Sequence, residues 1–293
     1  MGSPVPFSLL LPVYGGDDPR YLRAAFLSAV NQQTRPPNDV VLVQDGPVGS
    51  QLAAEIARLV RESPVPVRHL PLGVNVGLGP ALDRGIAECR HAVIARMDAD
   101  DICVPHRFAT QMPLIEDGAD IVGAGLMEFI DDIDNVVETR VPPIGEEQIR
   151  GAARFRDPFN HPTIVYRRDA VLAAGGYQDM PLMEDYLLFA RMLAGGAAPV
   201  NVAEPLVYYR VSAGAYARRG GVALLKAELE LQRRFRADGI TSRGEYVRNV
   251  VVRGGYRLVP EGIRRSAYRR IIARRGAERS DARPARPDDS APA

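Results

Sequence analysis

Residues 91–101 read HAVIARMDADD, an apolar run followed at once by a cluster of acids. The run from Ala92 to Met97 has the length and composition of a buried β-strand. Carboxylates follow it at Asp98, Asp100 and Asp101. Like charges this close repel one another unless water or a cation screens them, and carboxylate oxygens are ligands that Mg²⁺ and Mn²⁺ prefer. The segment therefore predicts a metal site at a strand end, with an acidic surface turn as the alternative.

Apolar runs and helical patterns alternate along the chain before this segment. Further strands are predicted at 7–13, 40–43 and 65–70, and helices at 19–31, 51–62 and 80–89. Strands separated by helices of this length imply right-handed crossovers and a mainly parallel α/β sheet covered on both faces. Tyr14, Asp45 and Asp98 each stand at the end of such a strand. They should meet at one edge, where open α/β sheets bind ligands.

The alternation weakens after about residue 125. The acids between 131 and 135 predict a turn, and residues 157–166 predict a loop that leads into a strand. Helices are expected at 183–193 and 222–236. Residues 277–293, rich in Pro, Asp, Ser and Ala, have the composition of a solvated tail.

The composition excludes several classes of protein. The 293 residues contain 37 basic and 36 acidic side chains, a net charge of +1, which argues against a nucleic-acid binder. The two cysteines, Cys89 and Cys103, lack metal-ligand spacing and suggest a reducing compartment. No apolar stretch approaches the roughly 20 residues of a membrane span, and the first residues lack a signal-peptide pattern. We therefore expect a cytoplasmic protein.

The small net charge conceals a basic carboxy-terminal region. Eleven arginines and three glutamates lie between Arg243 and Arg279. Within 260–276, apolar residues recur at helical spacing and are flanked by arginines. Such a helix can lie on a membrane surface and contact lipid phosphates, or it can pack on the protein with a solvated basic rim. The first alternative would place the protein peripherally on the inner face of the cytoplasmic membrane.

Further motifs occur in a fixed order around the acidic segment. They are Pro12-Val13-Tyr14, the stretch from Ser28 to Thr34, Gln44-Asp45-Gly46, Asn75-Val76-Gly77, Gly175-Gly176-Tyr177 and Met183-Glu184-Asp185-Tyr186. In this order they resemble the family 2 glycosyltransferases, which have the GT-A fold. Segments Gln44–Pro47 and Asn160–Thr163 are similar to those of bacterial non-processive enzymes of exopolysaccharide and O-antigen assembly. The resemblance implies a nucleotide-sugar-binding half at 1–125, an acceptor-binding and catalytic half at 126–215, and a helical, arginine-rich extension at 216–276.

The resemblance also implies the nucleotide site. Asp45 would accept a hydrogen bond from the base, typically uracil N3–H, although Gln44 replaces the first acid of the family's usual pair. Asp98 would lie near the ribose or the metal, and Asp100 on Mn²⁺ or Mg²⁺. Asn75 and Gly77 either contact the nucleotide or only cap and turn the chain. The remaining nucleotide-binding candidates are Pro12, Val13, Tyr14 and Arg96.

The catalytic residues implied by the resemblance lie in the second half. In an inverting transfer, an acceptor hydroxyl attacks the anomeric carbon opposite the leaving diphosphate, and a base must remove its proton. Asp185 is the predicted base and Glu184 the alternative. His161, Gly176 and Tyr177 would lie on the acceptor side. Arg210 either reaches the diphosphate or is a surface charge.

The predicted function is a metal-dependent, inverting transfer of sugar from a nucleoside-diphosphate sugar, expected to be a UDP-sugar. The acceptor would be a hydroxyl of a glycan or a polyprenyl-linked glycan in cell-surface polysaccharide or glycolipid synthesis. The alternatives are a catalytically silent scaffold of a polysaccharide complex and a sugar nucleotidyltransferase, although the loop after Tyr14 lacks the lysine of the latter. A homo-oligomer is compatible with the sequence. The donor sugar, the acceptor and the linkage do not follow from it.

Overall fold

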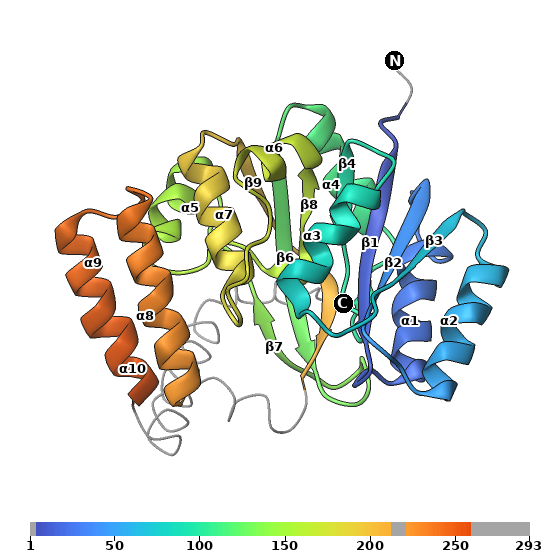
Figure 1. Cartoon of the computed structure of the whole chain (residues 1–293). Coiled ribbons are helices and arrows are strands. Elements are labelled where there is room, and N and C mark those ends of the chain that lie inside the picture. The colour runs from blue at the N-terminus through green and yellow to red at the C-terminus, as the bar shows by residue number, and fades with distance from the viewer. Residues whose placement is uncertain (1–3, 212–220, 259–293) are drawn as a thin grey trace, which may run out of the picture.

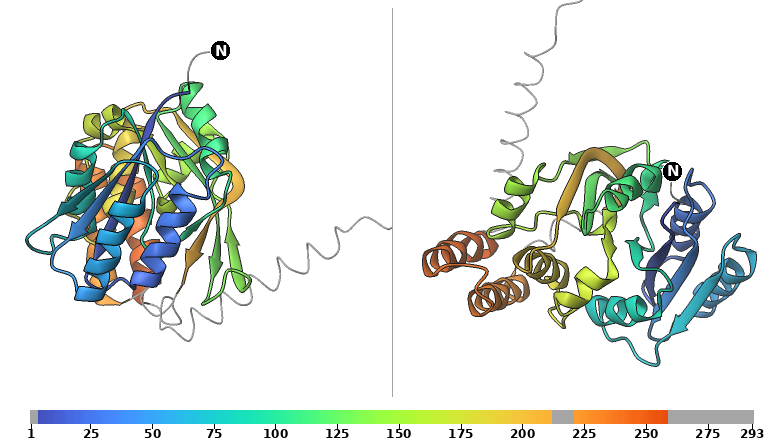
Figure 2. Two further views of the ribbon diagram at one scale, coloured as in Figure 1. Left: turned by 90° about the vertical axis from the view of Figure 1, so that its right-hand side faces the viewer. Right: turned by 90° about the horizontal axis from the view of Figure 1, so that it is seen from above.

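A nine-stranded mixed sheet forms the centre of the computed structural model, which describes residues 4–211 and 221–258 (Figure 1). The strand order is β3-β2-β1-β4-β8-β6-β9-β5, with β7 paired to β6. Helices cover the sheet, and two further helical segments lie at one flank (Figures 1 and 2). The α/β class and the helical carboxy-terminal part predicted from the sequence are confirmed.

The first half of the chain follows the predicted alternation closely. Its elements are β1 (Phe7–Tyr14), α1 (Pro19–Val30), β2 (Asp39–Asp45), α2 (Ser50–Glu62), β3 (Val67–Pro71), α3 (Leu78–Glu88) and β4 (Val93–Arg96). β1 pairs in parallel with both β2 and β4, and β2 pairs in parallel with β3. The carboxyl ends of these strands therefore lie at one edge, as predicted.

The second half makes the sheet mixed. Its elements are β5 (Ile102–Cys103), α4 (Arg107–Glu116), β6 (Ile121–Phe129), β7 (Val136–Arg140), α5 (Glu146–Ala153), a 3₁₀ turn (His161–Thr163), β8 (Val165–Arg167), α6 (Arg168–Ala173), α7 (Glu184–Ala194) and β9 (Pro199–Arg210). β8 is antiparallel to β4 and β6, and β7 is antiparallel to β6, whereas β9 is parallel to β6. The mainly parallel arrangement thus holds for the first four strands. Antiparallel neighbours need no helical crossover, so the alternation of strands and helices that marks the first half is lost here.

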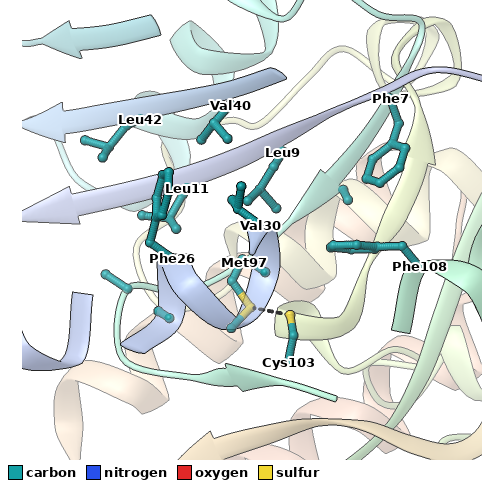
Figure 3. Packing of buried hydrophobic residues seen from close by; sticks show 14 of the residues in the cluster. Phe7, Leu9, Leu11, Phe26, Val30, Val40, Leu42, Met97, Cys103 and Phe108 are labelled. Carbon is teal, nitrogen blue, oxygen red and sulfur yellow. Dashed lines mark hydrogen bonds between the residues drawn. The ribbon is translucent and has the colours of Figure 1, made fainter. Parts of the chain in front are cut away.

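Both faces of β1 are buried, which explains its unbroken apolar run. Leu9 and Leu11 face the α1 side, where Phe26 packs against them, and Leu10 faces the α3 side (Figure 3). On the α3 side, Gly85 allows close packing, because a Cβ there would collide with Leu10. Burying each of these leucine side chains contributes about 1.5–3 kcal/mol. This core holds rigid the strand ends that carry the polar residues.

The last described elements are α8 (Val222–Ala237), α9 (Arg243–Asn249), a π-helical turn (Val250–Gly254) and α10 (Gly255–Leu258). The helix predicted at 222–236 is confirmed. Glu228 on α8 is fully buried and pairs with Arg253 and Arg257. The segments predicted as a basic helix at 260–276 and a tail at 277–293 lie outside the described residues. Among the residues that are described, no helix is long and apolar enough to cross a membrane.

Both cysteines are buried and unpaired. Cys103 lies beside Met97, with its Sγ 3.3 Å from the Met97 Sδ. The two cysteines therefore form no disulfide with each other.

Candidate active site

Two cavities meet beside the acidic segment that follows β4. The first has a volume of about 470 Å³ and lies at the carboxyl ends of the parallel strands. The second, of about 600 Å³, extends toward α7 and the loop after α5. Leu78, Asp98 and Tyr209 line both cavities. A molecule in one cavity can therefore approach a molecule in the other.

The first cavity gathers nearly all the predicted nucleotide-binding residues. From the sequence-based set it is lined by Pro12, Val13, Tyr14, Asp45, Asn75, Gly77, Asp98 and Asp100. These residues come from the ends of β1, β2 and β4 and from the turn that precedes α3. The predicted convergence at one sheet edge is confirmed.

Asp45 holds the turn that starts α3. Its Oδ1 accepts a hydrogen bond from the Val76 N–H at 2.7 Å, and its Oδ2 accepts one from the Gly77 N–H at 3.0 Å. Gly77 has a φ of +90°, a conformation that favours glycine. The carboxylate also lies at the positive end of the α3 dipole. Asp45 therefore shapes the wall of the first cavity, besides facing into it.

Acidic side chains crowd the floor of the first cavity. Asp17 lines it together with Asp98 and Asp100, and the Asp17 Oδ2 accepts a hydrogen bond from the Tyr14 N–H at 2.9 Å. Burial raises the pKa of Asp17 to about 6. Burial, followed by the charges of Asp98 and Asp17, also raises the pKa of Asp100 to about 6. A cation would relieve this unfavourable concentration of negative charge.

The residues present fit a divalent cation held jointly with a substrate. Among the described residues, no three His, Cys, Asp or Glu side chains are grouped as a ready metal cage. Asp98 is already paired with the buried Arg96, whose Nη1 donates to its Oδ2 at 2.6 Å. Mg²⁺ commonly takes one or two carboxylates and completes its shell with water and substrate phosphates. Asp100, with Asp98 beside it, provides that kind of site.

Glu184 and Asp185 line the second cavity from the first turn of α7. The Asp185 Oδ1 accepts a hydrogen bond from the Tyr186 N–H at 2.7 Å, and its Oδ2 lies 3.5 Å from the His161 Nδ1. Burial raises the pKa of Asp185 above its ordinary value. Burial and the neighbouring Asp185 charge raise the pKa of Glu184 to about 7. The Glu184 Oε2 is buried without a hydrogen-bond partner.

His161 connects Asp185 to Tyr177. Its Nε2 lies 2.8 Å from the Tyr177 hydroxyl. Burial, with a smaller contribution from Arg96, holds the pKa of His161 well below its ordinary value, so the ring is neutral. A neutral ring carries one N–H. With that proton on Nδ1, the ring donates toward Asp185, and Nε2 accepts from the Tyr177 hydroxyl.

Comparison with known proteins agrees with this geometry. The family model described as glycosyl transferase family 2 matches residues 8–175. The chain belongs to glycosyl transferase family 2. It is 36% identical to an uncharacterized glycosyltransferase of Haemophilus influenzae, over 91% of this chain and 98% of that one.

Two further family 2 relatives carry specific names. The amylovoran biosynthesis glycosyltransferase AmsE of Erwinia amylovora is 37% identical, over 78% of this chain and 84% of its own. An Escherichia coli protein named UDP-Gal:alpha-D-GlcNAc-diphosphoundecaprenol beta-1,3-galactosyltransferase is 31% identical, over 92% of this chain and 97% of its own. The predicted likeness to bacterial exopolysaccharide and O-antigen enzymes is confirmed.

Solved structures share the fold of this glycosyltransferase. S. aureus TarS 1–349 in complex with UDP-GlcNAc has a TM-score of 0.63 at 14% identity, covering 84% of this chain and 71% of that one. The mannosyltransferase PcManGT from Pyrobaculum calidifontis, in complex with GDP-Man and Mn²⁺, has a TM-score of 0.63 at 14% identity. That match covers 96% of this chain and 84% of that one. The predicted GT-A fold is confirmed.

Some predicted site residues of this family 2 chain have structural roles instead. Arg96 lies in the wall of the second cavity, where it holds Asp98. Arg210 donates from Nε to the Asp100 carbonyl at 3.0 Å and stacks over Tyr21 and Phe129. It lines neither cavity, and its contact with the diphosphate stays a prediction. Its guanidinium fixes the backbone of the acidic turn.

Gly176 and Tyr177 also stand behind the site. Gly176 has a φ of +66°, and a Cβ there would collide with the Asp83 carboxylate. That carboxylate accepts a hydrogen bond from the Tyr177 N–H at 3.1 Å. Neither residue is among those that line the second cavity, so their place on the acceptor side stays a prediction. Tyr177 acts on the site through His161.

The sequence did not single out several residues that line the cavities. Asp17 lies in the loop after β1, and its position just beyond a strand end is a signal that could have found it. Tyr209 lies on β9 and reaches both cavities. Arg140, Arg156 and Asp157 line the second cavity. No local sequence signal marks Tyr209 or the three residues of the second cavity, because the folding of distant segments brings them to the site.

Proposed function

We propose that this glycosyltransferase transfers a sugar, with inversion, from a nucleoside-diphosphate sugar to a hydroxyl of a glycan or lipid-linked acceptor. One observation carries the proposal: the acidic cavity and the cavity of Asp185 adjoin at Asp98, Leu78 and Tyr209. A donor in the first cavity and an acceptor in the second would meet there. Polysaccharide biosynthesis is the proposed setting, by analogy with the named relatives.

The first cavity is the proposed donor site. Pro12, Val13 and Tyr14 would pack around the nucleoside, and Asp45 would face the base. Asp100 and Asp98 would hold Mn²⁺ or Mg²⁺. When bound, the ion would act as a Lewis acid that offsets the charge developing on the departing diphosphate.

Asp185 is the proposed general base. As the acceptor oxygen bonds to the anomeric carbon, the bond from that carbon to the diphosphate breaks, and the hydroxyl proton moves to the Asp185 carboxylate. The Tyr186 N–H and His161 constrain this carboxylate from two sides. Glu184 stays the alternative, because it lines the same cavity and its Oε2 is buried without a hydrogen-bond partner.

His161 is proposed to position the base. A neutral Nδ1–H beside the Asp185 Oδ2 stabilises the ionised carboxylate without neutralising it. A Tyr177 hydroxyl that donates to Nε2 would keep the ring in the tautomer with its proton on Nδ1. His161 acts through Asp185 and is not assigned a contact with the reacting atoms.

Replacing the base tests the proposal. Asp185→Asn should lower the turnover of a UDP-sugar by a factor of about 10²–10⁴, the usual contribution of a general base. The stabilisation of the folded protein by UDP and Mn²⁺ should remain. Asp169→Asn, an exposed acid on α6, is the matched control and should leave turnover unchanged. Full turnover by Asp185→Asn would exclude Asp185 as the base, and absence of turnover in the wild type would favour a scaffold.

A donor screen completes the test. We propose a UDP-sugar as donor, and UDP-, GDP- and dTDP-sugars can be compared by the rise in melting temperature each gives with Mn²⁺. A larger rise with a GDP-sugar would contradict the choice of uracil.

We also propose a location on the cytoplasmic side, with peripheral membrane attachment. This location suits a lipid-linked acceptor such as the one in the E. coli relative's name.

A further inference from the structure

Several polar residues of the last helical segment, Arg243–Leu258, are turned inward. Asn249 is fully buried and donates to the Arg154 carbonyl at 2.7 Å and to Gln232 at 2.9 Å. Arg253 donates to both carboxylate oxygens of Glu228, at 2.6 and 2.8 Å, and to the Phe155 carbonyl at 2.7 Å. Hydrogen bonds and ion pairs therefore help to attach the segment to the protein.

Four of its apolar residues face outward. Val247, Val251, Val252 and Tyr256 are 59, 66, 51 and 52% exposed. In the π-helical turn at Val250–Gly254, residues five apart in the sequence lie more nearly on the same side of the helix than they would in an α-helix. Val252 and Tyr256 therefore lie nearer to the line of Val247 and Val251. We call these four residues the outer stripe.

This distribution is the reverse of that in an ordinary surface helix, which turns its apolar face to the core. A grouped exposed apolar surface commonly marks an interaction site. The segment that carries the outer stripe, from α9 to α10, lies at the flank of the molecule opposite α2 and β3 (Figures 1 and 2). No described part of the chain covers it.

The positive charge of this region favours an anionic partner. Arg243 and Arg248 are exposed in the same segment, while its acid, Glu245, is used in the capping box with Ser242. The sequence that follows, 260–276, contains arginines and apolar residues and a single acid, Glu261. A second copy of the chain, or this basic segment folded back, would bring arginines against arginines. An anionic surface would attract them.

We propose that the outer stripe lies on an anionic lipid bilayer, with Val247, Val251, Val252 and Tyr256 entering the headgroup region. Valines and a tyrosine on a segment that also carries exposed arginines suit that interface, where an apolar face is buried by about 5–10 Å. The inner side of the same segment contacts Arg154 and Phe155, just before Asp157 in the wall of the second cavity. Lipid contact would thus hold the acceptor cavity near the membrane, a consequence that rests on the proposed function.

Vesicle co-sedimentation of the full chain tests the stripe. The wild type should bind vesicles of phosphatidylcholine with one quarter phosphatidylglycerol, and bind phosphatidylcholine alone far less. Val251→Gln with Val252→Gln should lower the binding at least tenfold. Glutamine favours helix more than valine does, so the segment itself should persist. Leu172→Gln, at a 56% exposed leucine on α6, is the matched control and should bind like the wild type.

Each outcome separates the stripe from the proposed function. Undiminished vesicle binding by the double variant, or no binding by the wild type, would overturn the stripe as a lipid surface. A dimer seen by light scattering that the double variant converts to a monomer would assign the stripe to a second copy and also overturn it. Hydrolysis of UDP-sugar is measured in parallel, without vesicles. If it persists while binding fails, only this inference is lost; vesicle binding without any turnover removes only the proposed function.

Discussion

Replacing Asp45 with alanine tests whether this carboxylate supports the protein or only contacts a nucleotide. The side chain is 5% exposed and accepts two backbone N–H groups from the turn before α3. Asp45→Ala removes both acceptors and leaves the Val76 and Gly77 N–H groups beside the cavity. The turn should then lose its fixed position, and the wall of the first cavity should move with it.

The expected cost follows from these two hydrogen bonds. A hydrogen bond to a charged group contributes about 1.5–3 kcal/mol, and water entering the open cavity will recover part of it. We expect a loss of about 3 kcal/mol in the free energy of unfolding for Asp45→Ala. Asp45→Asn keeps one carbonyl acceptor but turns an amide toward an N–H, so it should lose roughly half to all of that amount. In a protein of this size, 3 kcal/mol lowers the melting temperature by about 6–12 °C.

Thermal unfolding without and with UDP and Mn²⁺ is the assay. Without nucleotide, both variants should melt below the wild type, with the alanine variant at least as low as the asparagine variant. The additional stabilisation by UDP should shrink as well, because the displaced turn lines the donor cavity. A nucleotide-free alanine variant that melts with the wild type, while losing the response to UDP, would refute the structural role assigned to Asp45.

Three further predictions concern other parts of the protein. Replacing the fully buried Glu228 with alanine leaves two arginines without their acid, and urea unfolding should show a loss of about 3–5 kcal/mol; a loss below about 1 kcal/mol would contradict the ion-pair role. Because Glu184 has a pKa of about 7 in the folded protein, above its ordinary value of 4.5, the wild type should lose stability as pH rises from about 4.5 to 7. Glu184→Gln should lack this loss and melt above the wild type at pH 8 but level with it at pH 4, and parallel melting curves at both pH values would contradict the shifted pKa. His161→Ala should lower kcat about tenfold or more, with little change in the KM for the donor. It should also move the acid limb of the pH–rate profile to higher pH, since Asp185 loses a neighbouring N–H. His161→Asn, which keeps an N–H donor, should recover part of the rate, and an unmoved acid limb would limit His161 to packing.

The first half of the fold follows from local patterns. Apolar runs such as Phe7–Val13 are strands buried on both faces, and the helical repeats between them are long enough for parallel crossovers. These rules act over short segments. They were sufficient to place Tyr14, Asp45 and Asp98 at one edge, where the structure has them.

Burial of charged residues was harder to foresee. Arg96 was grouped with the nucleotide site because it adjoins Asp98 in the sequence, yet its side chain is almost completely buried and pairs with that acid. For Arg210 the sequence left open a contact with the diphosphate or a surface charge, and in the structure two carbonyls and two aromatic rings hold its guanidinium. The type of residue sets what it can bind. Its partners depend on which segments pack around it.

The sequence by itself determined the α/β class, the strand ends that carry acids, and the family, because hydrophobic period and ordered motifs are properties of the chain alone. Tertiary structure alone decided that Tyr209 lines both cavities, that His161 reaches Asp185, and that valines of the last helical segment face outward. Each of these depends on contacts between segments far apart along the chain. Such contacts are set by the register and packing of whole elements, which no local pattern encodes.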